Sequence, residues 1–172
     1  LSGYVRETQQ FSSLDPSDGV DFGSVTVSIA RQSPDAIVTT DAGNMSSWIH
    51  RYWVMTPRNI MLGAIAGAMG FGVPAAVAAA IEQPDRKVIC FVGDGGILMT
   101  GQEIATAVAC GAKPKIVLSD NGIYGTIRTH QERHFPGRVS GTNLANPDFT
   151  LWARSFGIGA FTTAILVVDH GW

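Results

Sequence analysis

The chain has 172 residues, enough for one domain with a full hydrophobic core. Hydrophobic residues make up 45% and charged residues 15% of the chain, a composition typical of a well-buried globular protein and not of a disordered one. The formal net charge of −2 gives no general attraction for nucleic acid or for an acidic membrane, so we expect neither as a partner.

The chain begins with a polar stretch that has no hydrophobic period. We expect residues 1–20 to be a linker from an upstream domain that is missing here, and residues 21–172 to form one domain. The first stretch also has no apolar centre of the kind that a signal peptide requires. Asp21 can cap a helix that runs to about Gln32, with apolar residues on one face at Phe22, Val25 and Ile29.

A short β-branched strand is predicted at Ala36–Thr40, and the polar turn Asp41–Asn44 follows it. The aromatic and basic stretch Trp48–Arg58 is typical of a loop with a short helix. Gly63–Ile81 is apolar and about long enough to span a bilayer. Its glycines and Pro74 favour instead a packed core segment that is helical after the proline.

The central stretch predicts a strand, a turn, a helix and a second strand. The apolar run Val88–Val92 ends in a glycine-rich turn at Gly93–Gly96. We expect a helix at Gln102–Cys110, with Ile104, Ala107 and Val108 at core spacing. A second apolar run, Ile116–Leu118, leads into a further polar turn, residues 120–124.

Near the end of the chain, Pro147 and Asp148 open a helix to about Phe156, and Ala164–Val168 is the expected final strand. Nearly continuous apolar strands that alternate with helices predict an α/β fold, with a parallel sheet covered by helices on both faces. The two cysteines, Cys90 and Cys110, make no disulfide framework. We expect buried free thiols in a reducing, cytoplasmic protein.

Three polar turns, at residues 41–45, 93–96 and 120–124, fall at predicted carboxyl ends of parallel strands, where α/β proteins bind ligands. Each taken alone is also explained as an ordinary surface turn. Asp94 and Asn121 lie 27 residues apart, which leaves room for one helix and one strand between them. Two oxygen ligands beside glycine amides are what a magnesium–diphosphate pair requires.

The motif Gly93-Asp94-Gly95 followed 27 residues later by Asn121-Gly122 resembles the diphosphate-binding motif of thiamine diphosphate enzymes. Residues 67–74 and 125–128, GAMGFGVP and GTIR, are similar to the acetolactate synthase-like branch. The resemblance runs from about Asp21 to about Gly157, most of the chain. It implies the thiamine diphosphate-binding fold, and in particular the pyrophosphate domain.

The resemblance also implies a role for individual residues. Mg²⁺ would be bound by the side chains of Asp94 and Asn121 and by the backbone carbonyl of Ile123. Met69 would wedge the two rings of the cofactor into a bent shape, although simple core packing also explains it. The implied cofactor-binding residues are Gly43, Asn44, Met45, Gly67, Met69, Gly93, Gly95, Gly96, Ile123 and Tyr124.

The implied function is that of the cofactor-diphosphate and Mg²⁺-binding domain of a 2-oxo acid carboligase or decarboxylase, with pyruvate as one such substrate. No catalytic residue is expected in this chain, because family members take an activating Glu from a pyrimidine-binding domain on the same or another chain. We therefore expect the chain alone to be inactive and the complete protein to be a homo-oligomer. FAD, where the full-length enzyme uses it, would not bind this domain. The alternative is a non-catalytic remnant or regulatory subunit of the same fold.

The chain departs from the family at several positions. Gly96 stands where many members have Ser, Asp120 where they often have Asn, and His130 where acetolactate synthases commonly have Trp. The last helix is expected to be shortened. His130 and His134 are spaced as two metal ligands on a helix face, but a solvated pair is favoured because no third ligand is evident.

Overall fold

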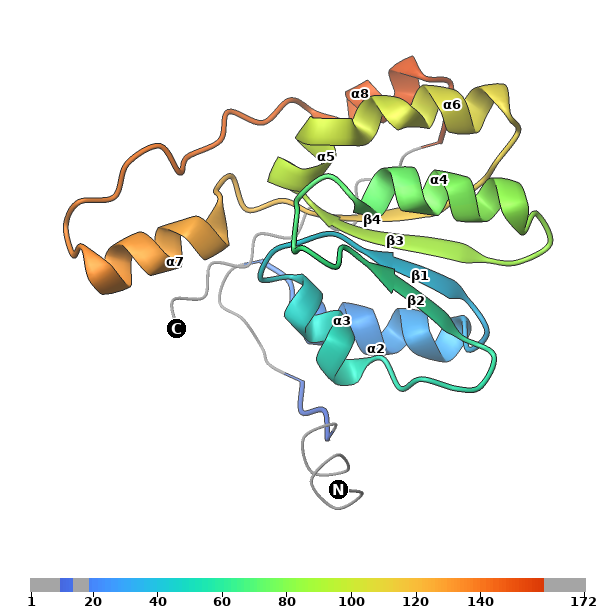
Figure 1. Ribbon diagram of the computed structural model, residues 1–172, viewed down its shortest axis with the longest axis horizontal. Coiled ribbons are helices and arrows are strands. Elements are labelled where there is room, and N and C mark those ends of the chain that lie inside the picture. Colours follow the sequence, from blue (N-terminus) through green and yellow to red (C-terminus); the bar gives the residue numbers. More distant parts are fainter. Residues whose placement is uncertain (1–9, 14–18, 160–172) are drawn as a thin grey trace.

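The computed structural model describes residues 10–13 and 19–159 of the chain. Within them, four strands form one parallel sheet in the order β2-β1-β3-β4 (Figure 1). The strands are β1 (Ile37–Thr40), β2 (Ile60–Gly63), β3 (Val88–Gly93) and β4 (Lys115–Ser119). The predicted parallel α/β sheet is therefore confirmed.

Helices cover both faces of this sheet (Figure 1). One face carries α2 (Phe22–Gln32) and α3 (Ser46–Tyr52). The other carries α4 (Gly72–Glu82), α5 (Asp94–Thr100), the 3₁₀ turn η1 (Gly101–Glu103), α6 (Ile104–Ala109) and α8 (Phe149–Ser155). The remaining helix, α7 (Gly125–His134), projects from the body and has no buried residue.

Strand β3 shows why the sheet needs two helical layers. Val88, Cys90 and Val92 point into the core beneath α4 and α6, whereas Ile89 and Phe91 point into the core beneath α2 and α3. All five side chains are buried. A strand that is buried on both faces reads as the continuous apolar run seen in the sequence.

The predicted helix after Asp21 is confirmed as α2. The Asp21 carboxylate accepts a hydrogen bond from the Gly23 amide at 3.0 Å, which satisfies a free donor of the first turn. Phe11, from the expected linker, packs over Gly23 and makes an edge contact with the Tyr52 ring at 5.1 Å between centroids. This part of residues 1–20 therefore contacts the domain.

Two elements, β2 and α7, were not predicted from the sequence. Strand β2 lies at the edge of the sheet, and its four residues are partly or fully exposed, so it carries no buried apolar pattern. Helix α7 is mostly polar, with Ile127 as its one large apolar side chain, and it lacks an apolar stripe. Neither element packs a buried face against the core, so neither has a hydrophobic period in the sequence.

The predicted turn at Gly93–Gly96 is wrong. Gly93 is extended and ends β3, and α5 begins at the next residue, so Asp94 and the two glycines after it form the first helical turn. The helix predicted at Gln102–Cys110 is likewise broken, because η1 precedes α6. Ile104 and Ala107 are buried as expected, but Val108 is 47% exposed.

Gly101 separates α5 from α6 and gives α8 its place. A Cβ atom at this position would overlap the Trp152 ring of α8 and lie 2.9 Å from Ile97 Cγ1. The helix predicted at Pro147–Phe156 is confirmed, with the Asp148 side chain capping it through the amides of Thr150 and Leu151. The predicted strand Ala164–Val168 and the shortened last helix lie outside the described residues.

The apolar stretch Gly63–Ile81 is divided between the end of β2, a loop and α4. The segment after Pro74 is helical as predicted, although α4 begins earlier, at Gly72. Among the described residues no helix is both long and apolar enough to cross a membrane. Cys90 is a buried free thiol as expected, whereas Cys110 is exposed, so the prediction that both are buried is wrong.

Candidate cofactor and metal site

The pairing of β3 with β4 brings two carboxylates together at one edge of the sheet. Gly93 is the partner of Ser119, so Asp94 and Asp120 are the next residues on neighbouring strands. Strand β1 ends beside them, and the Asp41 amide donates to the Phe91 carbonyl at 2.9 Å. The three polar segments singled out in the sequence thus follow three adjacent strand ends.

A pocket of about 120 Å³ opens at this edge. Its walls come from the loops after β1, β3 and β4, from the start of α7 and from Met69 of the loop between β2 and α4. It is lined by Phe22, Ala42, Gly43, Asn44, Met45, Trp48, Met69, Gly93, Asp94, Gly95, Gly96, Ser119, Asn121, Ile123, Tyr124, Gly125, Thr126 and Ile127. Of the predicted site residues, every one but Gly67 is on this wall. Gly67 lies exposed in the same loop as Met69.

Asp94 is the centre of the site and is only 4% exposed. Its Oδ2 atom accepts two hydrogen bonds, from the Gly122 amide and from Asn146 Nδ2, both at 2.8 Å. Its Oδ1 atom accepts one, from the Gly95 amide at 2.9 Å. Because each carboxylate oxygen offers about two lone-pair positions, Oδ1 keeps one acceptor position for a further ligand.

Asn121 and Ile123 supply the other two predicted ligand atoms. The Asn121 carboxamide oxygen accepts one hydrogen bond, from the Ile123 amide at 3.2 Å. The Ile123 carbonyl accepts one, from the Gly125 amide at 2.9 Å. Both oxygens therefore keep a lone pair, and both residues line the same pocket as Asp94.

Asp120 stands next to Asp94 and shares a donor with it. Asn146 Nδ2 reaches Asp120 Oδ1 at 2.7 Å as well as Asp94 Oδ2. Partial burial raises the pKa of the Asp120 carboxyl above its ordinary value; the hydrogen bond from Asn146 opposes this rise and the charge of Asp94 adds to it. Within the described part of the chain, neither Asp94 nor Asp120 is paired with a basic side chain.

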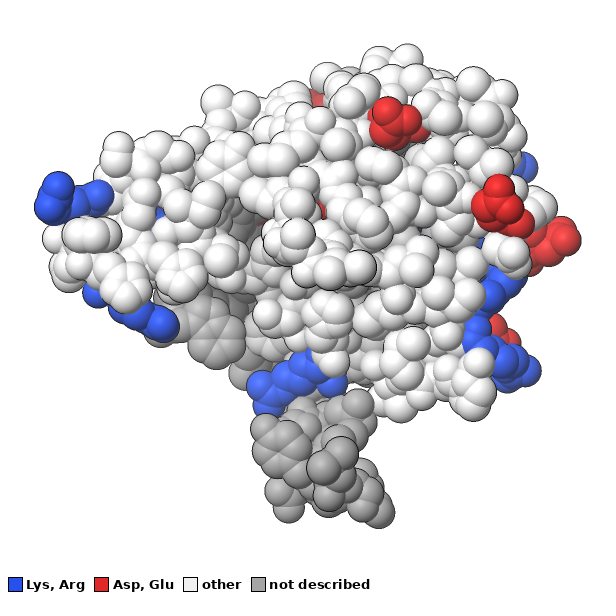
Figure 2. Space-filling model, in the orientation of Figure 1, with Lys and Arg blue, Asp and Glu red and all other residues white. Residues whose placement is uncertain are grey.

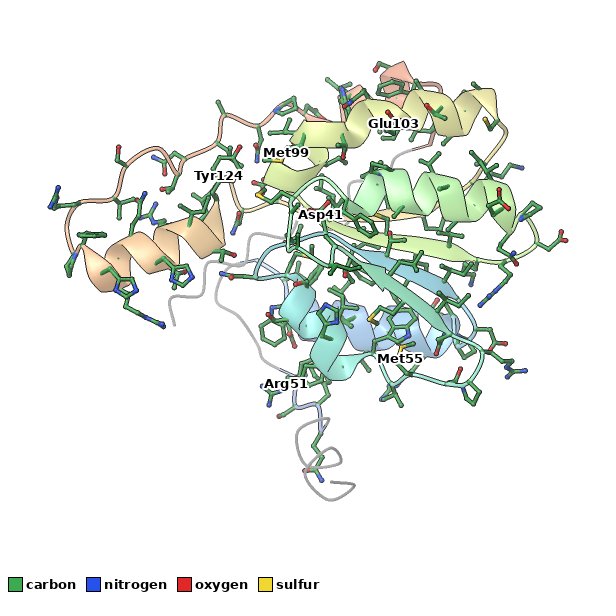
Figure 3. All side chains as sticks on the ribbon, in the orientation of Figure 1. Asp41, Arg51, Met55, Met99, Glu103 and Tyr124 are labelled. Atoms are coloured by element: carbon green, nitrogen blue, oxygen red, sulfur yellow. The ribbon has the colours of Figure 1, made fainter. Side chains whose placement is uncertain are left out.

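Asp41 is a third carboxylate at this edge and, like Asp94, it is buried, at 2% exposed; it holds the loop of Met69 in place. Its two oxygens accept hydrogen bonds from the Gly70 amide at 2.9 and 3.1 Å and from the Gly72 amide at 2.8 Å. It also caps its own turn through the Ala42 amide at 2.8 Å. Asp41, labelled in Figure 3, therefore ties the end of β1 to the start of α4.

Glycines line the floor of the pocket because side chains fill the space above them. A Cβ atom on Gly95 would lie 2.5 Å from Tyr124 Cε1 and 3.0 Å from Met69 Cε. A Cβ atom on Gly96 would lie 3.0 Å from Asp41 Cγ. A side chain at Gly96 would therefore crowd Asp41, which occupies that side.

Among the predicted cofactor-binding residues, Asn44, Met45, Gly95 and Gly96 could offer backbone amides to a diphosphate, and these amides differ in how free they are. The Gly95 amide already donates to Asp94, so its assignment to the diphosphate is not supported by this structure. The amides of Asn44 and Met45 precede α3 on the pocket wall, and neither donates to another described residue. The Asn44 side chain accepts a hydrogen bond from Thr126 Oγ1 at 2.7 Å, which joins the β1 loop to the start of α7.

Two polar residues of this site, Asp41 and Asn146, were not predicted from the sequence as functional residues. Asp41 carried a usable signal, because it follows a strand directly, just as Asp94 does. Asn146 carried none, because it lies in a loop rich in Gly, Asn and Pro without periodicity. His130 and His134 stack on the exposed face of α7, with ring centroids 6.2 Å apart, outside the pocket wall. The described residues hold no cluster of three or more metal-binding side chains of the His, Cys, Asp and Glu types.

Comparison with known proteins gives concordant matches. Residues 41–169 match the family described as thiamine pyrophosphate enzyme, C-terminal TPP binding domain. The acetolactate synthase large subunit of Parasynechococcus marenigrum (strain WH8102) is 39% identical over 148 residues, 84% of this chain and 24% of that protein. The isozyme 2 large subunit of acetolactate synthase from Escherichia coli (strain K12) is 41% identical over 130 residues, 74% of this chain and 24% of that protein.

A solved structure agrees with these relatives. The thiamine diphosphate-dependent 4-hydroxybenzoylformate decarboxylase of Rhodococcus jostii RHA1 superimposes with a TM-score of 0.79 at 25% identity, over 87% of this chain and 28% of that one. The chain thus spans about a quarter of the length of the relatives that it matches. The family match, the relatives and the shared fold lead to one conclusion: this chain belongs to the thiamine pyrophosphate enzymes, as a C-terminal TPP-binding domain of the acetolactate synthase-like kind.

Proposed function

We propose that this domain binds the diphosphate end of the cofactor through Mg²⁺ and serves a 2-oxo acid carboligase or decarboxylase. When bound, thiamine diphosphate supplies a nucleophilic carbon that adds to a 2-oxo acid and accepts the electrons released as carbon dioxide leaves. The residues of this chain bind and orient that cofactor. The substrate class proposed here, 2-oxo acids with pyruvate as one member, is the one that the resemblance to acetolactate synthases implies.

One observation carries the proposal: three oxygen atoms with a free acceptor position belong to residues that line one pocket. They are Asp94 Oδ1, the Asn121 carboxamide oxygen and the Ile123 carbonyl. Mg²⁺ prefers oxygen ligands of these kinds and keeps further positions for phosphate and water. Asp94 is nearly fully buried and has no basic partner in the part of the chain that the structure describes, and a cation would stabilise such a carboxylate.

The rest of the pocket suits the phosphates and one ring of the cofactor. The amides of Asn44 and Met45 would donate to phosphate oxygens, as would that of Gly96. Met69, half-buried on the wall, would support the bend between the two rings, and Gly67 lies in the same loop. The Gly43, Gly93, Gly95 and Tyr124 positions would shape the floor and the rim.

The pocket is too small to be the whole site. Its volume of about 120 Å³ is below the roughly 300–1,000 Å³ of pockets that bury a drug-sized ligand. Most of the face in Figure 2 carries no charged side chain, which agrees with a surface that other domains cover. We propose that a pyrimidine-binding domain completes the site, on the same or another chain of a homo-oligomer, and that the enzyme works in the cytoplasm.

Titration calorimetry with thiamine diphosphate and Mg²⁺ tests the binding role. The unaltered chain should bind the cofactor only when Mg²⁺ is present. Asp94→Ala should weaken binding by about 100-fold or more, because the first ligand and the buried charge are both lost. Asp35→Ala is the matched control, because Asp35 is a half-exposed carboxylate paired with Arg58 away from the pocket.

Two results would contradict the proposal. If the unaltered chain releases no heat with cofactor and Mg²⁺, or if Asp94→Ala binds as well as the unaltered chain, the assignment of the site fails. Consumption of pyruvate by the isolated chain would instead refute its dependence on another domain. Binding of cofactor and Mg²⁺ by a complete protein that shows no turnover would favour the alternative, a non-catalytic remnant or regulatory subunit.

A further inference from the structure

The side chain of Asn146 bridges two carboxylates at the edge of the pocket. Its Nδ2 atom lies 2.8 Å from Asp94 Oδ2 and 2.7 Å from Asp120 Oδ1. An amide nitrogen carries two hydrogens, so both are used, one for each carboxylate. Asn146 comes from the loop before α8, 52 residues from Asp94 in the sequence.

The orientation of this amide is dictated by the carboxylates. The Asn146 Oδ1 atom is buried and has no hydrogen-bond partner among the described residues. An unpaired buried acceptor costs about 1–3 kcal/mol. The reversed amide would place Oδ1 against two carboxylate oxygens, which repel it. The side chain therefore leaves its own oxygen unpaired in order to donate twice.

The backbone around Asn146 is also bound to the loop that carries the predicted ligands. The Tyr124 amide donates to the Thr142 carbonyl at 2.8 Å, and the Leu144 amide donates to the Gly122 carbonyl at 2.7 Å. The loop after β4 is thereby held by the backbone of Thr142 and Leu144. Asn146 adds the connection from this segment to Asp94, on the neighbouring strand end.

We propose that Asn146 is a positioning residue for the cation site, an inference that rests on the function proposed above. Together with the Gly122 amide, it fills both lone-pair positions of Asp94 Oδ2 and so leaves Oδ1 as the oxygen available to a cation. Its amide also separates the charge of Asp94 from that of Asp120. Asn146 itself contacts neither cation nor cofactor in this scheme.

The test measures binding of Mn²⁺, used as a paramagnetic probe for Mg²⁺, by electron paramagnetic resonance with thiamine diphosphate present. Asn146→Leu keeps a similar volume and removes both donors. Because groups that orient metal ligands contribute about 10–100-fold to metal affinity, we expect at least a tenfold loss. Asn143→Leu is the matched control: the Asn143 side chain is exposed, its one hydrogen bond among the described residues is accepted from Arg128 Nη1 at 3.4 Å, and the Mn²⁺ affinity of the variant should not change.

A second background separates positioning from a general structural role. Asp120→Asn removes one of the two charges that Asn146 keeps apart. In that background the loss from Asn146→Leu should be clearly smaller, because the filling of Asp94 Oδ2 still matters but there is no longer a second charge to keep apart. Thermal unfolding of each variant without metal checks that the chain is folded. Where Asn146→Leu does not fold, Asn146→Gln, which misplaces the same donors, replaces it and should lose about threefold or more.

The failures are distinguishable. If the unaltered chain does not bind Mn²⁺ with thiamine diphosphate, both the proposed function and this inference are refuted. If it binds Mn²⁺ and Asn146→Leu, or its Gln replacement, binds equally well, this inference alone is refuted. An equal loss with and without the Asp120→Asn substitution also refutes it, because the amide would then not act between the two carboxylates.

Discussion

Asp41→Asn should destabilise the domain although it changes the side chain by a single atom. The Asp41 carboxylate receives four N–H contacts from three amides, those of Ala42, Gly70 and Gly72, at 2.8–3.1 Å. It is 2% exposed, so water cannot replace them. An Asn side chain has one oxygen and one NH₂ group, and the NH₂ group would face donors in either orientation.

The size of the effect follows from these contacts. Either orientation of Asn loses one full hydrogen bond and one contact to the shared Gly70 amide, and it leaves one buried amide without an acceptor. A hydrogen bond to a charged group contributes about 1.5–3 kcal/mol, so we expect the free energy of unfolding to fall by about 2–4 kcal/mol. Domains of this kind are stable by about 5–15 kcal/mol, so the variant should remain folded.

Urea unfolding followed by far-ultraviolet circular dichroism measures the change, with the midpoint expected to fall at a similar slope. Asp35→Asn is the control for the same chemical change. Its side chain is 49% exposed and paired with Arg58 at 3.0 Å, so about 0–1 kcal/mol is expected. If Asp41→Asn proves no more destabilising than this control, Asp41 does not hold the Met69 loop through its charge.

Two further predictions concern packing and thiol chemistry. Gly101→Ala should lower the free energy of unfolding by about 1–3 kcal/mol, because the added methyl group overlaps the Trp152 ring. Urea unfolding measures this change. Gly159→Ala is the control: no atom lies within 4 Å of its Cβ, so its free energy of unfolding should change by less than about 0.5 kcal/mol. In the folded chain an aromatic disulfide reagent should modify Cys110 and spare Cys90, because Cys90 is 0% exposed and burial raises the pKa of its thiol to about 12.

Each of these has a clear contrary outcome. Equal stability of the two glycine variants would mean that α8 does not pack on Gly101 as the structure shows. Modification of both thiols at one rate in the folded chain would mean that β3 is accessible to the reagent. In denaturant the reagent should modify both Cys90 and Cys110, and this total of two thiols is the reference for the folded chain.

Local patterns in the sequence were enough to predict the parallel sheet and the position of the site. The apolar runs at β1 and β3 are buried on both faces, and the run at β4 packs partly buried against both cores, so the three runs stand out from the helices between them. Once the strands are parallel, the residues that follow them must meet at one edge. Asp94 and Asn121 were found in this way, and the structure places both on one pocket wall.

Contacts between distant segments account for what the sequence could not show. The Asp41 side chain points inward because it accepts hydrogen bonds from the amides of Gly70 and Gly72, 29 and 31 residues later. Residues 94–96 form the first turn of α5 instead of the predicted loop. The position of the Asn146 side chain depends on its hydrogen bonds to two carboxylates, Asp94 and Asp120, which follow neighbouring strands. No pattern within a short window encodes such partners, because their meeting depends on how the whole sheet and its helices pack.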